Sequence, residues 1–147
     1  MKMIKISTLL TFAVFCLNLN AQVVFQTTVP STDGYEVNIE VQLLSIDAPS
    51  TCPNGYNYNV ELGYDISFTG NNAPSNLWTF QGNIIDCGDA STIFFDLPNA
   101  GGNGTSTTTS NPWRSQSDCG SASLSSLGCE EIEITINGPG ITSQTIS

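Results

Sequence analysis

Residues 56–68, YNYNVELGYDISF, alternate without a break between apolar side chains and polar side chains or glycine. A period of two places each set on its own face of an extended strand, whereas a helix needs apolar residues every three or four positions. The stretch therefore predicts a long antiparallel strand with one face in a core and the other in water. Residues 35–43 and 131–136 alternate in the same way, and no helical period of comparable length is present.

Shorter β-rich segments flank these strands, and segments rich in Gly, Pro, Asn and Asp separate them. The strand candidates are residues 23–29, 76–80, 91–97, 105–110 and 141–147, and the turn candidates are residues 31–34, 52–55, 69–75, 98–104 and 137–140. Seven or eight strands at this spacing match two packed sheets better than a closed barrel. We expect an all-β, immunoglobulin-like antiparallel β-sandwich.

The first 21 residues have the layout of a secretory signal peptide. Two lysines precede a short apolar run, and the small residue Ala21 stands at the expected cleavage point. A lipoprotein leader cleaved before Cys16 is the alternative, but it requires a small residue where Phe15 stands. We expect residues 1–21 to be removed. Residues 22–147 then form one exported domain, outside the cell, at its surface or in the periplasm, without insertion into the membrane.

Beyond residue 5, Arg114 is the single basic side chain, against thirteen acidic ones and no histidine. Such a surface repels nucleic acid and anionic lipid, which excludes both as partners. Because the acids are spread along the chain, solubility outside the cell explains them better than a cation store. We interpret Arg114 as a structural clamp, with its guanidinium paired to Asp118 and lying against Trp113. A lone anion-binding arginine is the alternative.

Four cysteines follow the leader: Cys52, Cys87, Cys119 and Cys129. An even number of cysteines in an exported chain predicts two disulfides, and the sequence permits three pairings. Because short loops close most readily, Cys52–Cys87 with Cys119–Cys129 is the pairing that spacing favours. A zinc site built from the four thiolates is the weaker alternative, since no pair of cysteines is separated by only two residues.

The residue types present exclude most catalytic machinery. Ser-His and Cys-His catalysis need an imidazole, and Ser-Lys catalysis needs a lysine, which the chain lacks once the leader is gone. A pair of carboxylates, as in glycoside hydrolysis, remains available. Thirteen acids make such a pair almost inevitable, so its presence is uninformative. We therefore expect a protein that is not an enzyme.

Calcium is a possible ligand because it binds carboxylate, amide and carbonyl oxygens. Asp86 and Asp89 occupy one turn, and Asp96, Asn99 and Asn103 another. Neither segment matches a defined calcium loop, and Asp, Asn and Gly are the residues that turns use anyway. We therefore expect no cofactor.

Ligand-binding candidates are aromatic side chains and the asparagines of the turns. Trp78 and Trp113 could form a sugar-stacking platform, but we favour packing of both inside the sandwich. Turns 69–75 and 98–104 would present Asn71 and Asn72, and Asn99 and Asn103, to a partner.

Four segments carry a resemblance: the leader ending in NAQ, CPNGYNYNVEL, FFDLPNAGGNGTSTTTSNPWRSQSDC and LGCEEIEITINGPGI. Over nearly the whole mature chain, the sequence resembles the amino-terminal region of uncharacterised secreted, adhesin-like surface proteins of Gram-negative bacteria. That resemblance implies an exported β-domain and brings no catalytic residues.

We expect a non-enzymatic, surface-exposed binding or assembly module whose partner is a protein or glycan at the cell surface. The alternatives are a small calcium-assisted carbohydrate-binding module and a structural subunit of a surface polymer that exchanges an edge strand.

Overall fold

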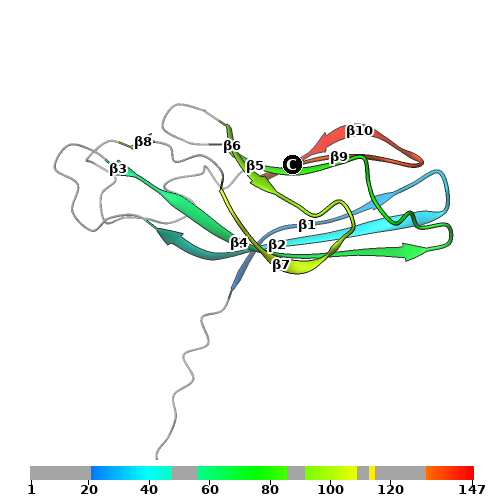
Figure 1. The fold of residues 1–147 in the computed structure, drawn as a ribbon, viewed down its shortest axis with the longest axis horizontal. Coiled ribbons are helices and arrows are strands. Elements are labelled where there is room, and N and C mark those ends of the chain that lie inside the picture. Colours follow the sequence, from blue (N-terminus) through cyan, green and yellow to red (C-terminus); the bar gives the residue numbers. More distant parts are fainter. Residues whose placement is uncertain (1–20, 48–55, 86–91, 109–112, 115–131) are drawn as a thin grey trace, which may run out of the picture.

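The computed structural model describes residues 21–47, 56–85, 92–108, 113–114 and 132–147, and these contain ten β-strands and no helix (Figure 1). The strands are β1 (Gln22–Pro30), β2 (Tyr35–Asp47), β3 (Tyr56–Asn57), β4 (Asn59–Gly70), β5 (Thr79–Ile85), β6 (Thr92–Asp96), β7 (Gly102–Thr107), β8 (Trp113–Arg114), β9 (Ile132–Gly138) and β10 (Ile141–Ile146). The expectation of an all-β chain is confirmed for the described residues.

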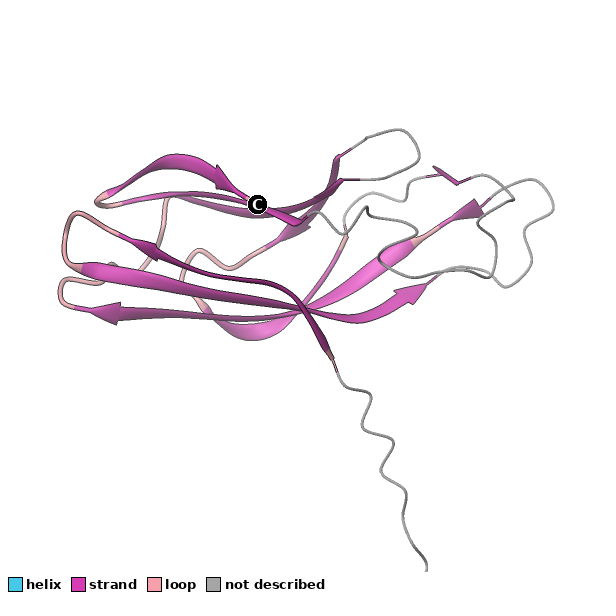
Figure 2. Ribbon diagram, turned by 180° about the vertical axis from the view of Figure 1, so that it is seen from behind, coloured by secondary structure: helices cyan, strands magenta, loops and turns pink. Residues whose placement is uncertain are grey.

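Eight strands form two four-stranded antiparallel sheets, which lie as two layers in Figures 1 and 2. Sheet 1 has the order β1-β2-β4-β7, and sheet 2 has the order β10-β9-β5-β6. The short strands β3 and β8 pair separately. The sandwich prediction is thus confirmed, whereas its immunoglobulin-like part is not. In immunoglobulin domains the third strand belongs to the second sheet, and here β1, β2 and β4 are neighbours in one sheet.

The strands run the length of the sandwich, so their ends gather in two groups. The turn end carries the connections 31–34, 71–78, 97–101 and 139–140, and the two tight hairpins among them lie at the right of Figure 1. At the opposite end, β2, β5 and β7 finish and β4, β6 and β9 begin.

The alternation in the two longest strands is confirmed. The apolar positions of β2 and β4 face the core in register, with Val37 opposite Phe68 and Ile39 opposite Ile66. Tyr58 separates β3 from β4, so the predicted strand 56–68 is two strands rather than one, although the Tyr58 side chain is buried with the rest of its face.

A β-bulge at Leu44 shifts the alternation within β2. Leu43 lies opposite Leu62 and Ser45 opposite Glu61, which leaves Leu44 as the extra residue. Strict alternation would turn the Ser45 hydroxyl inward. The bulge instead brings Ile46 against the core, and Leu44 stays 41% exposed on the outer face.

Inward-facing apolar side chains of both sheets form one core. In sheet 2, the ring of the fully buried Phe95 packs closely against Gly82 on the neighbouring strand, where any side chain would occupy the same space. The fully buried side chains of the core include Val37, Val41, Leu62, Ile84, Ile93, Ile134 and Ile136. Burial of this apolar surface is the main favourable contribution to folding.

Hydrogen bonds between turns join the two sheets at the turn end. The Thr32 amide donates to the Gly140 carbonyl at 2.8 Å, and the buried Tyr35 hydroxyl donates to the Pro139 carbonyl. Gly140 has a φ of 65°, which favours glycine at that position. Burial, and to a lesser extent the charge of Asp33, raises the pKa of the Tyr35 hydroxyl above its ordinary value of 10.0.

Candidate functional site

A hollow of about 370 Å³ lies at the turn end beside Trp78. The Trp78 side chain is 67% exposed, the largest exposure among the exposed large hydrophobic residues that the structure describes. The expectation that this tryptophan packs inside the sandwich is therefore wrong. The hollow is lined by Thr32, Trp78, Asn137, Gly138, Gly140, Ile141, Thr142 and Ser143.

The backbone around Trp78 is fixed although its ring is exposed. The Trp78 amide donates to the Asn137 carbonyl at 2.9 Å, and the Leu77 amide donates to the Asn99 carbonyl at the same distance. The sequence allows either Leu77 or Trp78 to point inward. In the structure Leu77 does so and is 3% exposed. Gly138 makes room for it, since a Cβ there would lie 2.6 Å from Leu77 Cδ2.

The side chains around the hollow are uncharged. Thr32, Thr142 and Ser143 carry hydroxyl groups and Asn137 carries an amide, so the lining contains both donors and acceptors. These residues were not predicted from the sequence. Residues 137–140 predicted a turn. Local sequence does not predict which distant segment packs against that turn.

The predicted asparagines do not act as one group. Asn71, Asn72 and Asn99 are exposed at the turn end. Asn72 has a φ of 58° and its Nδ2 donates to the Asp33 carbonyl at 3.1 Å, so part of its role is to hold two turns together. Asn103 lies elsewhere, in β7 opposite Asp65.

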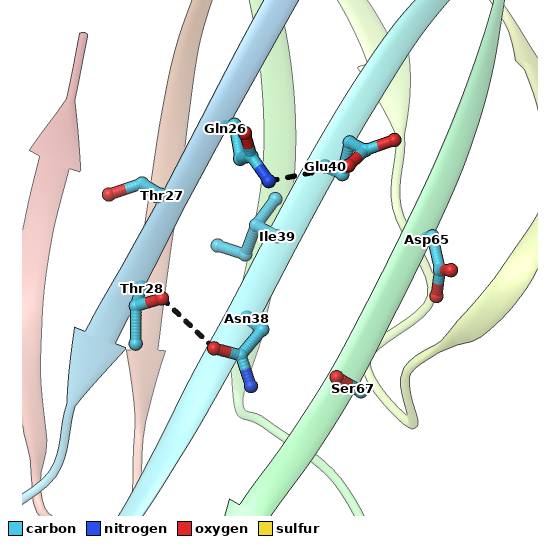
Figure 3. Close-up of a pocket in the computed structure, with 8 residues that line it drawn as sticks. All are labelled: Gln26, Thr27, Thr28, Asn38, Ile39, Glu40, Asp65 and Ser67. Atoms are coloured by element: carbon cyan, nitrogen blue, oxygen red, sulfur yellow. Dashed lines mark hydrogen bonds between the residues drawn. The ribbon is translucent and has the colours of Figure 1, made fainter. Parts of the chain in front are cut away.

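Figure 3 shows a second, smaller hollow of about 190 Å³ on sheet 1. Its outward polar side chains form rows across the strands. Gln26 lies opposite Glu40, which lies opposite Asp65. Glu40 accepts hydrogen bonds from Gln26 at 3.4 Å and from Gln42 at 2.6 Å. The next row contains Thr28, whose hydroxyl donates to Asn38 at 2.9 Å.

Asp65 also borders a third hollow, of about 320 Å³, whose lining includes Leu44. Like charges directly opposite each other, as Glu40 and Asp65 are, destabilise a sheet, and the two amides on Glu40 offset part of that cost. Among the described residues, no three acidic or cysteine side chains come together as metal ligands.

Of the three candidate metal ligands, only Asp96 belongs to the described residues, and it is exposed at the end of β6. Asp86 and Asp89 lie outside the described residues, as do Asp118 and the four cysteines, Cys52, Cys87, Cys119 and Cys129. The backbone of Trp113 and Arg114 forms β8, which pairs with β3. The proposed clamp depends on side chains outside the description and stays a prediction.

No protein-family model, curated protein or solved structure matches this chain. Within the described ranges there is no helix with the length and apolar character needed to cross a membrane.

Proposed function

We propose that this protein is an exported, non-enzymatic binding module that presents the turn end of a disulfide-bonded β-sandwich to a partner at a cell surface. The observation that carries the proposal is Trp78, whose ring is 67% exposed while its backbone is held by a 2.9 Å hydrogen bond beside a hollow. Exposed aromatic side chains on rigid backbone are favoured binding residues because little entropy is lost on contact.

Hydrogen bonds between the turns support this role. Hydrogen bonds from Thr32 to Gly140, from Asn72 to Asp33 and from Leu77 to Asn99 connect segments distant in sequence. A ligand would therefore meet a surface that is already ordered, and preorganisation of this kind strengthens binding. The leader-like first 21 residues support export, and the lack of histidine supports a non-enzymatic role.

Two disulfides belong to the proposal, with a pairing that differs from the one that loop length favours. In β5 and β9, Ile84 lies opposite Ile132, and Cys87 and Cys129 each stand three positions beyond that pair in the sequence. If this antiparallel register continues beyond the described residues, it would bring the two cysteines opposite each other. We propose the pairs Cys87–Cys129 and Cys52–Cys119.

The second pair has support from β3 and β8. Tyr56 lies opposite Arg114, and Cys52 precedes the former by four positions while Cys119 follows the latter by five. If this antiparallel register continues beyond the described residues, it would bring residues near these two positions opposite one another.

The test is adhesion of beads coated with the exported protein to panels of bacterial and host cells. We expect beads to bind at least one surface, and Trp78→Ala to reduce the bound number severalfold. Phe94→Ala, which removes another exposed aromatic side chain from sheet 2, is the matched control and should bind as wild type. Equal adhesion of the Trp78→Ala and wild-type beads, or no adhesion to any surface, would refute the proposal.

A further inference from the structure

We infer that the hollow beside Trp78 binds a neutral carbohydrate, with one sugar ring stacked on the exposed indole. This inference rests on the proposed function, and it names the class of ligand that the turn end takes. Three properties of the hollow carry it: the aromatic surface, the uncharged polar lining and the acidic surroundings.

The aromatic surface suits a sugar because the ring of a pyranose has apolar C–H faces and a polar perimeter. The Trp78 indole offers a large flat apolar surface that is 67% exposed and therefore open to a ligand. The backbone that carries this ring is held by the hydrogen bond from the Trp78 amide to the Asn137 carbonyl, and by the buried Leu77 before it. A ligand that stacks here does not have to order the loop first.

The lining suits the sugar perimeter. Sugar hydroxyls both donate and accept hydrogen bonds, and the hydroxyls of Thr32, Thr142 and Ser143 do the same, while the Asn137 amide offers one group of each kind. The Thr32 hydroxyl already donates to the Gly140 carbonyl at 3.3 Å, so towards a ligand it acts as an acceptor. An apolar partner surface would displace water from the hydroxyls of Thr142 and Ser143 and from the Asn137 amide without replacing its hydrogen bonds, which is costly. At about 370 Å³ the hollow falls within the usual size of small-ligand sites, roughly 300 to 1,000 Å³.

The charge of the surroundings selects neutral sugars over acidic ones. No lining residue carries a positive charge that could pair with a uronate or sulfate. Asp33 adjoins the hollow, since a Cβ on Gly140 would lie 2.7 Å from its carboxyl carbon, and the chain as a whole is strongly acidic. An anionic glycan would be repelled by this field.

The experiment titrates the full exported protein with neutral gluco-, manno-, galacto- and xylo-oligosaccharides, and with oligogalacturonate as the anionic probe. Calorimetry gives affinities, and the indole N–H resonances report contact, with the Trp78 signal assigned from Trp78→Phe. We expect at least one neutral oligosaccharide to bind and to shift the Trp78 resonance, and oligogalacturonate to do neither. Trp78→Ala should weaken that affinity at least tenfold and Trp78→Phe by less, while Phe94→Ala leaves it unchanged.

Two results overturn the inference: no neutral oligosaccharide shifts the Trp78 resonance, or Trp78→Ala binds as tightly as wild type. Treating the target cells separates this failure from failure of the proposed function. Periodate oxidation of surface glycans should abolish bead adhesion if the ligand is a sugar. Adhesion that survives periodate but is lost after protease treatment would keep the binding function and reject the carbohydrate. A chelator arm should leave affinity unchanged, because no cation is part of the proposed site.

Discussion

Substituting Gly82 by alanine tests the packing at the centre of sheet 2. The added Cβ would lie under 3.0 Å from three ring atoms of Phe95, closer than real Cβ atoms approach their neighbours. Phe95 is fully buried, so its ring has no solvent to move into. Either the ring leaves its rotamer or β5 and β6 separate, and both cost free energy.

Overpacking of this kind costs typically about 1 to 3 kcal/mol. We expect Gly82→Ala to reach or exceed the upper value, because the clash is with a whole aromatic ring rather than the tip of a flexible side chain. Against a total stability of about 5 to 15 kcal/mol, that is a large loss. Gly63→Ala is the matched control, because Gly63 also lies in a central strand, β4, with a paired strand on each side. Its Cβ would meet Leu44 Cδ2 at 3.4 Å, an ordinary contact.

Urea unfolding of both variants followed by circular dichroism provides the measurement. Gly63→Ala should be neutral or more stable by about 0.4 to 1 kcal/mol, since alanine narrows the unfolded ensemble. Shortening the ring with Phe95→Leu should cost less in the Gly82→Ala background than in wild type, because the two residues share one space. Equal midpoints for Gly82→Ala and Gly63→Ala, or additive effects of Gly82→Ala and Phe95→Leu, would refute the packing described here.

Five further outcomes are expected. Tyr35→Phe should lower stability by about 1 to 2 kcal/mol through loss of an inter-sheet hydrogen bond. In wild type the pKa of Tyr35 is raised above 10.0, so the unfolded state ionises first and stability should fall as pH rises past 10, a loss that melting curves of the variant should lack. Thr108→Val removes the acceptor of the buried Val60 amide, 3.1 Å away, and should cost about 1 to 3 kcal/mol by urea unfolding, with Thr108→Ser close to wild type. Non-reducing peptide mapping should recover Cys87 joined to Cys129, and four free thiols would reject both disulfides. Millimolar calcium should raise the melting temperature by less than about 5 °C.

The long strands of sheet 1 could be predicted because each buries one face. In such a strand, apolar and polar residues alternate in the sequence. β5 was predicted only in part, as residues 76–80, while the strand is Thr79–Ile85. Phe80, Gly82 and Ile84 are the inward positions of this strand, and because Gly82 carries no side chain, the apolar alternation is interrupted at its centre. Strand order depends on contacts between segments distant in sequence. The alternation within one segment does not predict those contacts.

Trp78 shows the same limit for the candidate site. Leu77 and Trp78 are both apolar and adjacent, so one must point inward and the other outward, and local sequence does not choose between them. Gly138, sixty-one positions further along the chain, leaves the space that the buried Leu77 side chain occupies, since a Cβ there would lie 2.6 Å from Leu77 Cδ2. Asn71, Asn72 and Asn99 lie in connections as predicted, since turn chemistry is local, whereas Asn103 belongs to β7.

The direction in which the strands run has a mechanical consequence. β1 begins with Gln22 opposite Leu43 and β10 ends with Ile146 opposite Ile134, so the start of β1 and the end of β10 both lie away from the turn end. A tether attached at either end would point the Trp78 hollow outward from the surface that holds it. Tension between that tether and a bound ligand would load the sheets along their strands. Rows of inter-strand hydrogen bonds would then be sheared together instead of being opened one after another.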